Sequence, residues 1–69
     1  MKFKFREDEV VVLKEDLPDF GLRAGDPGTV WALYATEPPA YEVTFRLPDG
    51  SELGMVMSED DLEPARLPN

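Results

Sequence analysis

Residues 9–34 read EVVVLKEDLPDFGLRAGDPGTVWALY, and this stretch decides the fold. Three consecutive valines in residues 9–13 favour a strand, and the run is too short for a helix. In residues 14–27 proline and glycine recur so closely that neither a long helix nor a strand can persist, which predicts a long loop. Residues 28–34 return to strand-forming residues. The stretch therefore predicts two strands joined by a long loop.

The loop carries its own packing and turn signals. Leu17, Phe20 and Leu22 give it apolar side chains to tuck against a core, as loops of this length in compact domains usually require. It ends in Gly-Asp-Pro-Gly at residues 25–28, where we expect the glycines to serve backbone geometry. A ligand-approach loop is the alternative, although no Gly-Lys-Ser/Thr follows as in a phosphate-binding loop.

The rest of the chain continues in short strands. Residues 40–47 alternate, and their apolar face consists of Tyr41, Val43, Phe45 and Leu47. A turn at residues 48–51 joins them to a strand at 52–57. Ser58 is a suitable N-cap for a short 3₁₀ turn. Residues 63–67 are expected to form a last short strand despite Pro64, since proline is tolerated at the start or edge of a strand.

This order of elements predicts an all-β fold, a small SH3-like, partly open five-stranded barrel with a short 3₁₀ turn before the last strand. We expect a single domain over residues 1–69, with an N-terminal arm at 1–7 and the barrel at 8–67. The nearest rival is the OB-fold, which normally has a helix where this chain has only the 48–51 turn.

Several segments together resemble a family of small bacterial proteins named Domain of Unknown Function 4926. The segments are residues 9–18, 21–22, 25–26, 28–30, 41–43 and 45, followed by the acidic turn before Leu62. The resemblance implies an SH3-like β fold and a bacterial protein, and it implies no activity and no site residues. Residues 25–30 are also similar to the turn of RNA-binding KOW segments, but there Asp16, Asp19 and Asp26 stand where those proteins carry basic residues.

Charge and composition narrow the function. The chain has 7 basic and 15 acidic residues and a net charge of -8, which argues against nucleic acid as a partner. It has no cysteine and no histidine, so we expect no disulfide, no zinc and no cofactor, and no activated serine for catalysis. The first residues lack the apolar core of a signal peptide and no segment is apolar enough to span a membrane, which predicts a cytoplasmic protein. Because no histidine can activate a serine and a small barrel has little room for a cleft, we also expect that the protein is not an enzyme.

The aromatic residues are the best candidates for contact with another protein. We predict a partner-binding set formed by Phe20, Trp31, Tyr34 and Tyr41, with Asp16 and Asp19 adding charge complementarity. Strand alternation puts Trp31 and Leu33 on the face opposite Val30, and it does not say which face is buried. Trp31 is therefore either a core residue or an exposed anchor.

Two further segments leave alternatives open. Residues 55–57, Met-Val-Met, either fill the core or form an edge strand that pairs with a second copy in a homo-oligomer. Residues 59–63 hold Glu59, Asp60, Asp61 and Glu63, which form a solvated turn, a weak divalent-cation site or a contact face for a basic partner.

The resulting hypothesis is a non-catalytic protein-interaction module or small accessory subunit. The first alternative is an acidic antitoxin-like or immunity-like protein that neutralises a basic, co-encoded protein, motivated by the charge of -8. The second is a weak nucleic-acid-binding domain that uses the KOW-like turn.

Overall fold

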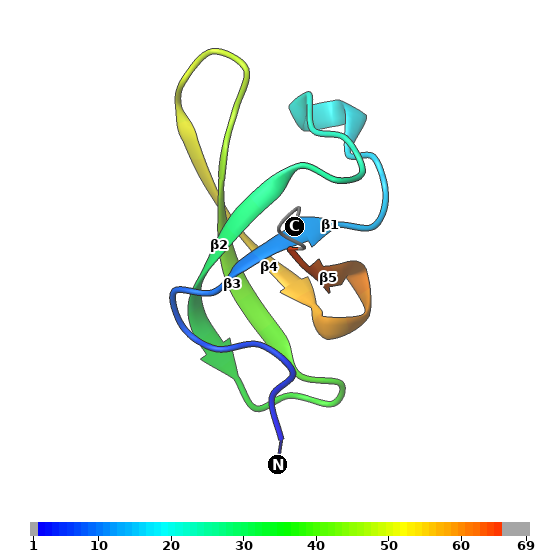
Figure 1. Ribbon diagram of the computed structural model, residues 1–69, viewed down its shortest axis with the longest axis vertical. Coiled ribbons are helices and arrows are strands. Elements are labelled where there is room, and N and C mark those ends of the chain that lie inside the picture. Colours follow the sequence, from blue (N-terminus) through cyan, green and yellow to red (C-terminus); the bar gives the residue numbers. More distant parts are fainter. Residues whose placement is uncertain (1, 66–69) are drawn as a thin grey trace, which may run out of the picture.

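The computed structural model describes residues 2–65, which form one antiparallel sheet of five strands (Figure 1). The elements in chain order are β1 (Val10–Leu13), η1 (Pro18–Phe20), β2 (Pro27–Tyr34), β3 (Ala40–Arg46), β4 (Glu52–Ser58), η2 (Glu59–Asp61) and β5 (Leu62–Pro64), where η marks a 3₁₀ turn. In space the strands follow the order β4-β3-β2-β1-β5. The prediction of an all-β fold is confirmed, as is the 3₁₀ turn before the last strand.

The ends of the strands differ from the expected ones by a few residues. β2 already begins at Pro27, and the last strand begins at Leu62 and ends at Pro64. Leu62 joins this strand because its side chain is buried and its backbone pairs with Leu13 of β1. Residues 66 and 67 of the predicted last strand lie outside the described residues.

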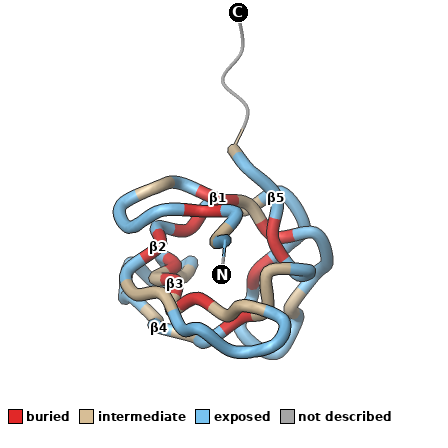
Figure 2. Tube along the Cα trace, turned by 90° about the horizontal axis from the view of Figure 1, so that it is seen from below, coloured by how far each residue is buried: buried red, intermediate tan, exposed pale blue. Residues whose placement is uncertain are grey.

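The core lies inside the curve of the sheet. Figure 2 shows the strands around a ring, with the buried stretches on several of them. The buried residues are Phe5, Val11, Leu13, Leu22, Val30, Tyr41, Val43, Phe45, Met57 and Leu62. On β3 the alternation predicted from the sequence is confirmed, since Tyr41, Val43 and Phe45 are all buried. Tertiary packing thus follows the period of two in that strand.

The N-terminal residues belong to the core, although we expected residues 1–7 to form an arm outside it. Phe5 is only 1% exposed. Its ring lies edge-on to Tyr41 at a centroid distance of 5.3 Å, and the ring of Phe3 does the same at 6.0 Å. The arm alternates phenylalanine with basic residues, so Phe5 is buried and Phe3 half-buried while the lysines at positions 2 and 4 stay exposed.

The long loop between β1 and β2 is folded, as its apolar residues predicted. Leu17 and Leu22 exchange two backbone hydrogen bonds, and Leu22 is buried. At the end of the loop the N–H of Gly25 donates to the carbonyl of Leu13, and Gly25 has φ of +90°. Glycine adopts this conformation without steric cost, so here it does serve backbone geometry. None of the helical segments in residues 2–65 is long and apolar enough to cross a membrane.

Candidate functional site

Trp31 lies at a β-bulge in β2, where the pairing with β3 shifts by one residue. Val30 pairs with Val43, whereas Ala32 pairs with Glu42, so Trp31 has no partner of its own. The bulge lets both Val30 and Leu33 pack into the core, and it leaves the Trp31 side chain 67% exposed. Neither strict alternation considered from the sequence is therefore right, because a bulge inserts one residue and changes the face of all that follow.

The backbone just before this bulge, at Val30, is held by the turn at residues 6–9. The N–H of Asp8 donates to the carbonyl of Val30 at 2.8 Å, and the N–H of Val30 donates to the carbonyl of Glu9 at 2.9 Å. The turn is closed by the Glu9 side chain, whose Oε1 accepts the N–H of Arg6 at 3.0 Å. Trp31 is thus an exposed side chain on a backbone fixed at its neighbour Val30.

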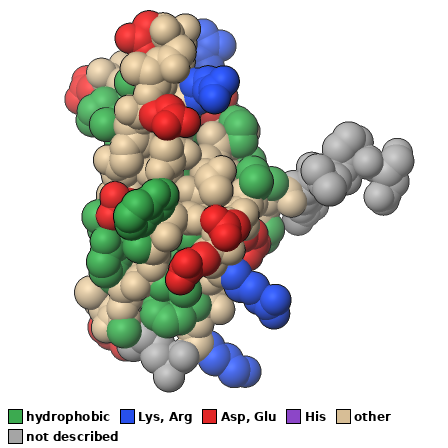
Figure 3. Space-filling view, turned by 90° about the vertical axis from the view of Figure 1, so that its left-hand side faces the viewer, with side chains coloured by type: hydrophobic (Ala, Val, Ile, Leu, Met, Phe, Trp, Pro, Cys, Tyr) green, Lys and Arg blue, Asp and Glu red, His purple; other side chains and the backbone are tan. Residues whose placement is uncertain are grey.

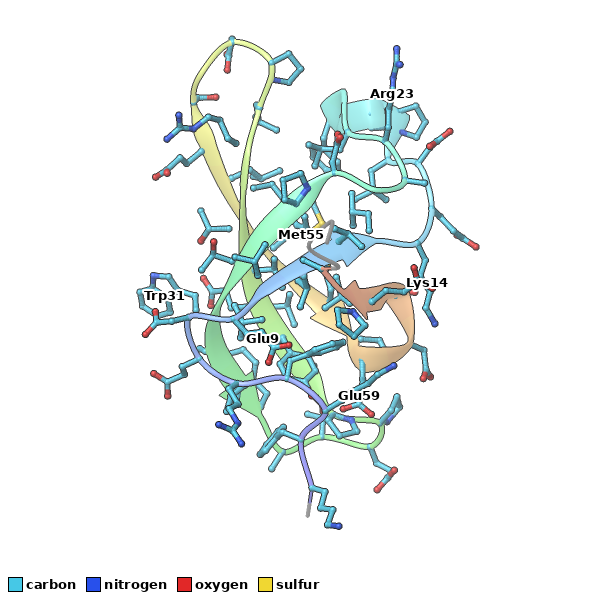
Figure 4. All side chains as sticks on the ribbon, in the orientation of Figure 1. Glu9, Lys14, Arg23, Trp31, Met55 and Glu59 are labelled. Carbon is cyan, nitrogen blue, oxygen red and sulfur yellow. The ribbon has the colours of Figure 1, made fainter. Side chains whose placement is uncertain are left out.

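A shallow groove of about 480 Å³ runs beside Trp31 on the outer face of the sheet. Its lining comes from four strands and consists of Val10, Pro27, Gly28, Thr29, Trp31, Thr44, Arg46 and Glu52. Val10, Thr29 and Thr44 are cross-strand neighbours and form its small, uncharged centre. Figure 3 shows apolar side chains at mid-height on this side of the molecule with carboxylates beside them, and Figure 4 shows Trp31 pointing outward there.

Tyr34 lies on the same outer face as the groove. Its hydroxyl donates to Glu42 Oε1 at 2.8 Å, and this hydrogen bond to a carboxylate raises the pKa of Tyr34. Glu42 in turn pairs across the sheet with Val56 of β4, which is 60% exposed. The outer face therefore offers two aromatic rings, two exposed valines (Val10 and Val56) and a carboxylate that is hydrogen-bonded to one of the rings.

The other predicted contact residues lie elsewhere. Phe20 is 44% exposed and belongs to η1, across the molecule from Trp31 (Figures 1 and 4). Asp19 is exposed in the same 3₁₀ turn. Asp16 helps to hold the loop, since its Oδ1 accepts the N–H of Ala24 at 2.8 Å. The structure thus brings Trp31 and Tyr34 to one face and puts the loop residues on another.

Tyr41 does not lie on the surface, and its predicted place in a contact set is corrected. The side chain has no exposed area because Tyr41 continues the inward face of β3. Its hydroxyl accepts the N–H of Lys4 at 2.9 Å and that of Phe5 at 3.3 Å, and it donates to Glu59 Oε2 at 2.6 Å. Tyr41 therefore anchors the N-terminal residues to the sheet.

Tyr41 and Glu59, which share a hydrogen bond, both have a shifted pKa. Burial, followed by the hydrogen bond to the Glu59 carboxylate, raises the pKa of Tyr41. Hydrogen bonds from the Tyr41 hydroxyl and from the Lys4 N–H lower the pKa of Glu59 below its ordinary value. The Glu59 carboxylate is thus held by hydrogen bonds at the surface of the fold. Among residues 2–65 no three acidic side chains are placed to hold a metal ion.

Glu59 should make the stability of the protein fall at acid pH. Because the pKa of Glu59 is lower in the folded state, its contribution to stability is fully present at a pH above its unfolded-state pKa. That contribution is lost as the pH falls through its folded-state pKa. We expect Glu59→Gln, which keeps an acceptor for Tyr41 but does not titrate, to flatten the loss of stability below about pH 4.5. Urea unfolding at a series of pH values measures this. Asp61→Asn, at an exposed position of the same turn, should retain the wild-type slope, and equal slopes for all three proteins would refute the assignment.

The sequence did not point to the groove residues Val10, Thr29, Thr44, Arg46 and Glu52. Part of the lining could have been found from the alternation in residues 40–47, which places Thr44 and Arg46 on the outer face, opposite the apolar side chains. What the sequence lacked was the order of strands in the sheet, which brings Val10 and Glu52 to opposite ends of one groove.

One five-stranded antiparallel sheet, an acidic composition and an exposed tryptophan beside a groove define a small all-β domain with a candidate contact surface. Residues 7–64 match the family model described as "Domain of unknown function (DUF4926)", and the chain belongs to this family. The match covers all five strands of the sheet and confirms the family resemblance seen in the sequence. No curated protein and no solved structure matches the chain.

Proposed function

We propose that this protein is a non-catalytic protein-interaction module of a bacterial cytoplasm, built as an SH3-like, partly open barrel. The observation that carries the proposal is Trp31, which is 67% exposed on a held bulge beside a groove. The barrel assignment is supported by the order of elements and by the ring of strands in Figure 2.

An exposed tryptophan does not give the protein the stabilisation that burial of its large apolar side chain would provide. Full burial of a large apolar side chain is worth roughly 1.5–3 kcal/mol, and the bulge forgoes much of this for Trp31. Tryptophan is also the residue type most enriched at the energetic centres of interfaces. Because Val10 and Thr29 lie beside it in the groove, a partner can cover the indole and the uncharged floor together.

The charge of the chain sets the chemistry of the partner. With a net charge of -8, the protein attracts a surface that is basic and repels one that is acidic. Such complementarity affects the rate of association more than the final affinity. We therefore expect a protein partner with a basic rim around an apolar centre.

Replacing Trp31 by alanine should weaken partner binding about 30-fold or more, as for the central residue of an interface. The fold should persist, because the side chain contributes little to the core. The protein partner is first captured from a lysate of the source with the wild-type chain, and its affinity for each variant is then measured by calorimetry.

The matched control is Phe20→Ala, which removes another exposed aromatic ring far from the groove. It should change the affinity by less than about twofold. Wild-type affinity in the Trp31 variant, or a loss in the Phe20 variant alone, would move the contact surface away from β2.

A further inference from the structure

The two edges of the sheet are built differently. β5 is three residues long and contains Pro64. A short strand and a proline are two of the features by which proteins prevent an edge from pairing with another chain. β4 at the other edge is seven residues long, contains neither proline nor lysine, and pairs with β3 without any register shift. The fold therefore protects one edge and leaves the other long and regularly paired on its inner side only.

The backbone of β4 presents unpaired groups along this edge. The N–H of Leu47 donates to the carbonyl of Ser51, and beyond the other end the N–H of Glu59 donates to the carbonyl of Pro39. Because bonded and non-bonded pairs alternate in an antiparallel ladder, Leu53, Met55 and Met57 bond to β3. The N–H and C=O groups of Gly54 and Val56 consequently point away from β3, and within residues 2–65 they have no hydrogen-bond partner.

The side chains beside the edge differ on the two faces of the sheet. On the inner face Leu53 and Met55 are half-buried and apolar. On the outer face Val56 is 60% exposed, Gly54 has no side chain, and Glu42 and Glu52 supply carboxylates. A strand added here meets apolar residues on one side and, on the other, the carboxylates of Glu42 and Glu52, with Arg46 of β3 opposite Glu52.

We propose that the free edge of β4 binds an extended segment of a partner protein as a sixth, antiparallel strand, with apolar and basic residues alternating along that segment. The apolar residues of the segment lie beside Leu53 and Met55, and the basic residues lie beside Glu42 and Glu52. A second copy of the chain is the weaker match, because it would bring another net charge of -8 to the same edge. This surface is distinct from the centre of the Trp31 groove, and the inference does not depend on the proposed function.

The direct test uses a blocked synthetic peptide, Lys-Val-Lys-Val-Lys-Val-Lys, titrated into the wild-type protein. In an antiparallel pair, residues that lie opposite each other have their side chains on the same face of the sheet, so the outward-facing lysines lie opposite Gly54 and Val56. The N–H groups of these lysines then point toward β4 and would bond to it. We expect binding that weakens as salt is added. Methylation of the lysine backbone nitrogens should weaken it at least about tenfold, as expected for lost hydrogen bonds. Methylation of the valine backbone nitrogens, which face away from β4, should leave it nearly unchanged.

Variants of the protein locate the site. Val56→Pro removes an N–H that β3 does not use, and it should weaken the peptide at least about tenfold. Val56→Lys keeps the N–H but adds a positive charge that repels the lysines of the peptide, so it should also weaken binding. It replaces the proline variant in the test if that variant does not fold. Trp31→Ala should retain wild-type peptide affinity, which separates this inference from the proposed function. No peptide binding, equal binding of both methylated peptides, or self-association through β4 that strengthens with salt would overturn the proposal.

Discussion

Replacing Phe5 by alanine is expected to lower the free energy of unfolding by about 3–5 kcal/mol, the usual cost of truncating a buried phenylalanine. The ring is 1% exposed and packs on Tyr41, so its loss leaves a cavity between the N-terminal residues and the sheet. A core in a domain of this size rarely supplies more than about 3–5 kcal/mol in total. The Phe5 variant should therefore be largely unfolded at 25 °C, as measured by near-ultraviolet circular dichroism and urea titration.

The control for this prediction is Lys2→Ala in the same segment. The Lys2 side chain is exposed, and its removal should change stability by less than about 0.5 kcal/mol. If the Phe5 and Lys2 variants unfolded at the same urea concentration, the N-terminal residues would not be part of the core in solution.

Gly28→Ala is expected to destabilise the protein by about 1–3 kcal/mol, although it adds only one methyl group. A Cβ at Gly28 would lie 2.6 Å from both Phe45 Cε1 and Val43 Cγ1, far inside van der Waals contact. Both neighbours are fully buried, so neither has space to move. The midpoint of urea unfolding measures the effect.

A second glycine in the same sheet provides the matched control. A Cβ at Gly54 on the outer face would meet only Glu42 Oε2, at 3.3 Å, and that carboxylate is the end of a flexible side chain. Gly54→Ala should thus be neutral, or stabilising by about 0.4–1 kcal/mol through the unfolded chain. Equal effects of the two substitutions would contradict the close packing around Gly28. Val43→Ala should also relieve part of the cost of Gly28→Ala, which a double-mutant cycle detects.

The local elements were predictable because short-range physics specifies them. The alternation of residues 40–47 already placed Tyr41 beside Val43 and Phe45 on one face, so the burial of Tyr41 follows from that pattern. We nevertheless expected a surface role for Tyr41 because of its residue type, and the pattern is the better guide. Ser58 caps the turn as predicted, with its Oγ accepting the N–H of Asp60, since capping depends only on neighbouring residues.

The candidate contact set could be predicted only in part. Trp31 and Tyr34 are both exposed on the outer face, but Phe20 and Asp19 lie on the folded loop, and Asp16 bonds within that loop. Residue type suggests which side chains suit an interface, whereas their grouping depends on the path of the loop through space.

The sequence by itself determined the all-β class, the order of the strands along the chain, the folded loop and its turn, and the inward face of β3, because each depends on residues close together in the chain. Only the tertiary structure decided where Trp31 points and where Phe5 goes. The bulge at Trp31 exists because Val30 and Leu33 both pack inside while β3 continues regularly beside them. Phe5 is buried because Tyr41, 36 residues away, offers its ring and its hydroxyl. Contacts of that separation leave no periodic trace in the sequence.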